Sequence, residues 1–157
     1  MGRLRKYLSL TRRERQYFCE ASILLLLSSL CVKTIAFRHI DNFLRRRWND
    51  RTNGAFDHAD EIGLVNLSLS RAANVLPWKS LCLSRSIAAF IMLCRRGIPA
   101  LMVAGVKFSE DSSLLAHAWI QTRFGVIDAN SQNSAFTPVV TIGQESLIAD
   151  SARNRVD

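Results

Sequence analysis

One segment in the middle of the chain, residues 77–99, is bounded so sharply that it constrains the fold more than any other stretch. Pro77 cannot continue a preceding helix, and Arg95-Arg96-Gly97 supplies a basic last turn and a left-handed cap before Pro99. Between these limits the apolar residues recur at three- and four-residue spacing, at Leu83, Ile87, Phe90, Ile91 and Cys94. The pattern predicts a helix through Cys94 with Cys82 in its first turn.

Cys82 is a candidate nucleophile because of this position. The positive end of the peptide dipoles lies at a helix N-terminus and favours the thiolate form of a cysteine. The alternative is a structural cysteine, since cysteine is among the most buried residue types. The choice between these readings depends on finding catalytic partners.

The partners are predicted in residues 114–130, where the pattern indicates two short strands around a turn near Arg123–Gly125. In an antiparallel pair, the numbers of directly opposed residues have a constant sum, which is odd for a loop of even length. A two- or four-residue loop therefore puts His117 and Asp128 on one face. A loop of odd length would separate them, and Asn130 or another group would then orient the imidazole.

A family resemblance rests on several segments in the right order between Trp78 and Asn130. The segments are Trp78, Cys82-Leu83-Ser84-Arg85-Ser86, Arg95-Arg96-Gly97-Ile98-Pro99-Ala100, Gly105-Val106 and Ala116-His117-Ala118-Trp119. Together they resemble the transglutaminase-like, papain-type cysteine peptidase of lasso-peptide biosynthesis, the leader-peptidase half of the lasso B protein. The basic, leucine-rich N-terminal stretch also resembles these proteins.

The resemblance implies a Cys-His-Asp triad, with Cys82 as nucleophile, His117 as general base and then acid, and Asp128 as the orienting carboxylate. The backbone amide of Cys82 would supply one oxyanion donor. The second donor stays open among Trp78, Lys79 and Ser80. Ser84 and Ser86 are poor nucleophile candidates, because no Gly-x-Ser-x-Gly elbow surrounds them.

The resemblance also implies a substrate and partners. The enzyme would remove the leader of a ribosomally made precursor, and an ATP-dependent macrolactam synthetase would then close the ring. The chain has no room for the leader-binding module of fused versions, so we expect a separate leader-recognition protein and no cofactor. Two other functions stay open: acyl transfer to an amine through the same thioester, and a non-catalytic, basic interaction or membrane-peripheral protein.

Length and cysteine usage bound the surroundings of this site. The 157 residues suffice for one compact domain, which we divide into a helical region 1–56, a peptidase core 57–142 and a tail 143–157. The four cysteines are dispersed, without a C-x-x-C pair or a nearby histidine cluster. We therefore expect neither a metal site nor a disulfide framework, and a cytoplasmic location.

The charge is distributed unevenly. Residues 1–51 contain 12 basic and 4 acidic residues, and the remainder contains 9 of each, so the net charge of +8 lies entirely in the N-terminal third. Such a segment suits nucleic acid, anionic lipid or an acidic protein. No recognition helix or stacking pattern supports nucleic acid, so we do not expect it as a partner.

The N-terminal region begins with a capping box, Thr11-Arg12-Arg13-Glu14, which predicts a helix from about Arg12. Its run from Ile23 to Val32 is apolar nearly all round, so we expect a helix buried on several sides or covered by a partner. Only 12 residues separate Glu20 from Lys33, fewer than the roughly 20 that a membrane span requires. Peripheral membrane contact is the alternative.

The remaining elements complete an α+β architecture, in which N-terminal helices pack on a transglutaminase-like, papain-like core with a small antiparallel sheet. We expect helices over 35–48 and 60–76, a loop over 49–56, a buried strand over 101–106, a polar connection over 109–113 and an edge strand over 136–142. His39 and His58 lie in polar surroundings and are predicted to be surface residues rather than ligands.

Overall fold

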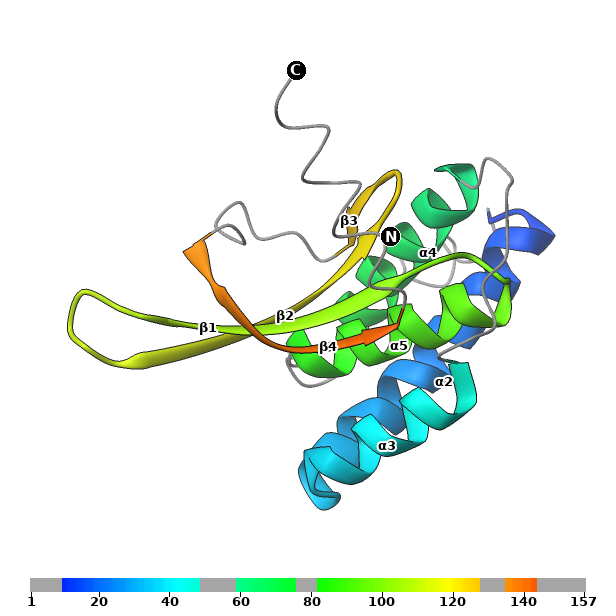
Figure 1. Cartoon of the computed structure of the whole chain (residues 1–157). Coiled ribbons are helices and arrows are strands. Elements are labelled where there is room, and N and C mark those ends of the chain that lie inside the picture. The colour runs from blue at the N-terminus through cyan, green and yellow to red at the C-terminus, as the bar shows by residue number, and fades with distance from the viewer. Residues whose placement is uncertain (1–9, 49–58, 76–81, 128–134, 144–157) are drawn as a thin grey trace.

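The structure is a computed structural model that describes residues 10–48, 59–75, 82–127 and 135–143. These residues form a layer of helices against one antiparallel sheet, which confirms the predicted α+β class (Figure 1). The helices are α2 (Arg12–Thr34), α3 (Phe37–Trp48), α4 (Ala59–Val75) and α5 (Cys82–Arg95). The strands are β1 (Leu101–Phe108), β2 (Leu114–Thr122), β3 (Gly125–Ile127) and β4 (Thr137–Gly143).

Helix α2 begins with the predicted capping box. The Glu14 backbone N–H donates to Thr11 Oγ1 at 3.2 Å, and the Thr11 N–H donates to Glu14 Oε2 at 2.9 Å. These two bonds satisfy amides that the first turn would otherwise leave without partners. Glu14 also pairs with Arg71 of α4 at 3.1 Å, so the cap ties the two helices together.

The expected burial of α2 on several sides is wrong. One side of the helix is buried, through Tyr17, Ala21, Leu25, Ser28 and Ser29. The opposite side exposes four aliphatic residues, Ile23, Leu26, Leu27 and Leu30. The reason is geometric: α4 and α5 both pack on the first side, and no described element covers the second.

Helix α5 is the centre of the core, as its sequence pattern predicts. Most of its residues are buried, including Ile87, Phe90 and Leu93. Gly97 adopts the predicted left-handed conformation, with φ of 70°, and its N–H donates to the Cys94 carbonyl at 3.1 Å. The expected contact between α4 and α5 is also present, with α2 lying across both.

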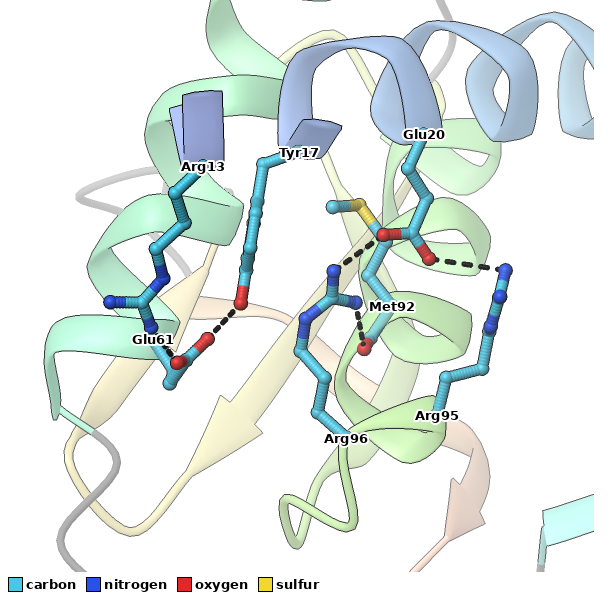
Figure 2. Close-up of polar contacts among 7 residues, drawn as sticks. All are labelled: Arg13, Tyr17, Glu20, Glu61, Met92, Arg95 and Arg96. Carbon is cyan, nitrogen blue, oxygen red and sulfur yellow. Dashed lines mark hydrogen bonds and ion pairs between the residues drawn. The ribbon is translucent and has the colours of Figure 1, made fainter. Parts of the chain in front are cut away.

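Polar contacts fasten α2 to α4 and α5 (Figure 2). Glu20 of α2 lies between the last residue of α5 and the residue after it, with Arg95 at 3.1 Å and Arg96 at 2.5 Å. The Arg96 guanidinium also lies 4.1 Å from the centre of the Tyr17 ring. On the α4 side, Glu61 accepts hydrogen bonds from Arg13 and Tyr17. The helices therefore form one packed layer.

The sheet has the strand order β3-β2-β1-β4, with all neighbours antiparallel. Strand β1 is central and starts fully buried, as predicted, and β4 is the expected edge strand with Pro138 near its start. Strands β2 and β3 enclose a two-residue turn, because Thr122 pairs with Gly125. The predicted connection over 109–113 is a tight turn closed by the Ser109 N–H and the Ser113 carbonyl at 2.8 Å.

The two faces of the sheet carry separate apolar clusters. Met102, Ile120 and Ile142 belong to the main core, which they share with the helices. Leu101, Val103, Trp119 and Phe136 form a smaller cluster of their own. Because alternate residues of a strand point to opposite faces, β1 and β2 each contribute to both clusters.

Several predictions fall outside the described residues: those for residues 49–56, His58, Leu76, Pro77, Trp78, Lys79, Ser80, Asp128, Asn130 and the tail after Gly143. His39, by contrast, lies in α3 and is exposed, as predicted.

Candidate active site

Cys82 is the first residue of α5, which confirms its predicted place at a helix N-terminus. The residue is partly buried, and α5 packs against β1 and β2. A helix N-terminus leaves backbone N–H groups free to donate to an anion or a developing oxyanion. The position therefore suits a thiolate nucleophile beside a sheet.

His117 lies in the middle of β2, directly opposite Gly105 of β1. Its imidazole stacks on Trp119, with ring centres 5.9 Å apart and an interplanar angle of 18°, and the Phe136 ring centre lies 5.5 Å away. The Nε2 atom is buried and has no hydrogen-bond partner among the described residues. An imidazole nitrogen in this state retains its capacity to take part in a proton transfer or a new hydrogen bond.

Gly105 makes the aromatic setting of His117 possible. A Cβ atom at this position would lie 2.9 Å from the Thr137 carbonyl oxygen, 3.1 Å from the Trp119 ring and 3.2 Å from the Phe136 Cβ. This role of Gly105 was not predicted, and Phe136 was predicted only as the start of an edge strand. The available signal was a glycine inside an apolar strand, which marks a close approach of another group.

Two of the three predicted triad residues, Cys82 and His117, lie within the described residues. His117 lies on the sheet face of Trp119 and Phe136, whereas α5 covers the opposite face through Ile120, so the described residues do not bring the imidazole and the Cys82 thiol together. No hydrogen bond joins Cys82 to His117 within the described part of the chain. The β2–β3 loop has the even length that the prediction of His117 and Asp128 on one face requires. Asp128 itself lies outside the described residues, so the triad stays a prediction.

Other reactive groups are less suited to catalysis. Ser84 and Ser86 are fully buried in α5, in keeping with the expectation that neither is a nucleophile. Burial raises the pKa of the Cys94 thiol to about 12, so this cysteine stays protonated. All four cysteines are reduced, and the described residues include no group of three or more His, Cys, Asp or Glu side chains placed to hold a metal ion.

Comparison with known proteins provides the family. Neither a search of curated proteins nor a search of solved structures found a match. A family profile described as the Transglutaminase-like superfamily matches residues 13–141, which include nearly all of α2, the whole of α3 to α5 and most of the sheet. The matched segment contains Cys82, His117 and Asp128. The chain belongs to the transglutaminase-like superfamily.

Proposed function

We propose that this protein is a cysteine peptidase that removes the leader from a lasso-peptide precursor. The observation that carries the proposal is Cys82 at the N-terminus of a helix inside a transglutaminase-like domain. Helix α5 contacts the strand of His117 on the opposite face of the sheet, so the proposal requires the imidazole to reach Cys82. The domain suggests a cysteine-based enzyme, and the resemblance around Cys82 and His117 supports leader removal. The triad and the peptidase activity are part of the proposal.

The proposed reaction has two steps. His117 takes the proton of Cys82, the thiolate attacks the scissile carbonyl, and the protonated imidazole gives its proton to the departing amine, which leaves a thioester. Water then loses a proton to His117 and attacks the thioester, which releases the leader carboxylate and restores the thiol. Asp128 would stabilise the imidazolium, and the Cys82 backbone N–H would donate to the oxyanion.

The proposal includes two protein partners. A separate leader-recognition protein would present the precursor, and an ATP-dependent macrolactam synthetase would use the amine that cleavage releases. The basic N-terminal region is a candidate docking surface for the recognition protein, because charge complementarity favours encounter between partners.

Mass spectrometry of a candidate precursor incubated with this protein and its recognition partner tests the proposal. We expect cleavage at one bond, lost in Cys82→Ala and in His117→Ala but retained in Cys94→Ala. Cleavage that persists in Cys82→Ala would overturn the assignment of the nucleophile. Release of the leader as an amide of an added amine, in place of the leader as a free acid, would establish acyl transfer instead of hydrolysis.

Alkylation separates an enzyme from a non-catalytic protein. Cys19 is exposed, so it serves as an internal reference for an ordinary accessible thiol. We expect iodoacetamide to modify Cys82 faster than Cys19 at neutral pH, and His117→Ala to remove the difference. A Cys82 thiol that is inert in both proteins would favour the interaction-protein alternative.

A further inference from the structure

The exposed aliphatic side of α2 is covered by none of the elements that the structure describes. We call Ile23, Leu26, Leu27 and Leu30 the α2 stripe; each has between 46% and 58% of its surface exposed. Their three- and four-residue spacing puts them on one face, over about 10 Å of helix. Figure 1 shows α2 on the outside of the helical layer, and α5 packs between α2 and the sheet.

Cations lie on the same side of α2 beyond the stripe in both directions, Arg12 about three turns before Ile23 and Lys33 one turn after Leu30. Both side chains belong to exposed residues. The exposed side of α2 therefore combines an aliphatic centre with positive ends.

The acidic residues of α2 do not offset these cations, because both are engaged with the neighbouring helices. Glu14 pairs with Arg71 of α4, and Glu20 pairs with Arg95 and Arg96. Helix α3 adds further exposed cations at Arg38, Arg46 and Arg47. Exposed arginine and lysine side chains of α2 and α3 therefore carry positive charge on the protein surface, whereas the α2 carboxylates are paired inside the helical layer.

We propose that α2 lies in the plane of an anionic lipid surface, with the α2 stripe among the acyl chains and the flanking cations at the headgroups. An interfacial helix needs an apolar face together with basic residues, and α2 has both. A second copy of this chain fits less well. A parallel pair of stripes would bring Lys33 of one copy against Lys33 of the other. In an antiparallel pair Lys33 would face the region of Glu20, whose carboxylate is already paired with Arg95 and Arg96.

In this proposal α2 lies in the plane of the lipid surface and does not cross the membrane. By length and hydropathy α2 is long and apolar enough to cross a membrane. Its other side, however, carries Tyr17, Ala21 and Leu25 in the protein core, and Glu20 in ion pairs with the end of α5. A spanning arrangement would break those contacts, whereas an in-plane arrangement keeps them.

Vesicle co-sedimentation of the full-length protein tests the proposal. The vesicles are phosphatidylcholine alone and an equimolar mixture of phosphatidylcholine and phosphatidylglycerol. We expect binding to the mixed vesicles that weakens with added salt. Leu26→Glu with Leu30→Glu should reduce the partition coefficient by about tenfold or more. The matched control, Phe108→Glu with Val139→Glu, alters residues that are 76% and 64% exposed on the sheet, and it should bind as wild type does.

Three outcomes would overturn the proposal. One is absence of binding to the mixed vesicles by a protein whose circular dichroism and melting transition show that it is folded. Another is equal loss of binding in the stripe and control variants. The last is a wild-type dimer, seen by light scattering, that becomes a monomer in the stripe variant without any vesicle binding. None of these outcomes bears on precursor cleavage, so the two proposals fail separately.

Discussion

Gly105 is the residue on which the surroundings of His117 depend most directly. Gly105→Ala would bring a methyl group within 2.9 Å of the Thr137 carbonyl and against two aromatic side chains. We expect a loss of about 1–3 kcal/mol in the free energy of unfolding, measured by urea denaturation, together with slower precursor cleavage.

Gly63 provides the matched control for that substitution. It lies inside α4, and a Cβ atom there would meet nothing within 4 Å. Gly63→Ala should therefore stabilise the protein by about 0.5–1 kcal/mol, because alanine favours helix. Equal effects of the two substitutions would show that β1 and β4 separate easily at Gly105.

Cys94 differs from the exposed Cys19 in its chemistry. Burial raises its pKa to about 12, so the thiolate is scarce at pH 8. We expect iodoacetamide to modify Cys19 and leave Cys94 intact in the folded protein, and to modify both in urea, as peptide mass mapping would show. Modification of Cys94 at the rate of Cys19 without denaturant would contradict its burial.

At the scale of elements, the cap of α2 should make stability depend on pH. The Thr11 N–H and the Arg71 guanidinium hold the pKa of Glu14 below its ordinary value of 4.5. A lowered carboxyl pKa contributes stability above the unfolded-state value, and this contribution is lost as the pH falls through the folded-state value. Wild type should melt above Glu14→Gln at pH 7, and the difference should shrink as the pH falls below 4.5.

The control for this pH dependence is Glu110→Gln, which removes the same charge in the exposed β1–β2 turn. Its melting temperature should follow that of wild type across the range. A difference between wild type and Glu14→Gln that stays constant down to pH 3 would show that the carboxylate charge does not stabilise the cap.

The predictions from sequence succeeded where the deciding interactions are local. Thr11 and Glu14 cap the same turn that their spacing encodes, and Gly97 ends the helix that begins at Cys82. The turn near Arg123–Gly125 likewise follows from neighbouring residues, whereas its length of two residues was left open by the sequence. The exposure of Leu27 could not be predicted in this way, because it depends on whether another element lies over that side of α2. The face that His117 shares with Phe136 depends on a distant strand in the same sense.

At the scale of the whole molecule, α2 is part of the core and not an appendage. Leu25 is 0% exposed, whereas Leu27, two residues later, is 51% exposed. Leu25→Ala should lower the free energy of unfolding by about 2–5 kcal/mol, and Leu27→Ala should change it by less than about 0.5 kcal/mol. Urea denaturation measures the free energy of unfolding of both variants. Similar losses in the two would contradict the burial of Leu25 and the exposure of Leu27.

The position of α2 in the chain has a consequence for synthesis. Its core partners, α4 and α5, are made after it, and Glu20 meets Arg95 and Arg96 only when α5 is complete. Until then a growing chain presents the inner side of α2 around Leu25 to solvent in addition to the outer one. The contacts that bury the inner side of α2 therefore form only after Arg96 is made, and an incomplete chain exposes both sides of the helix.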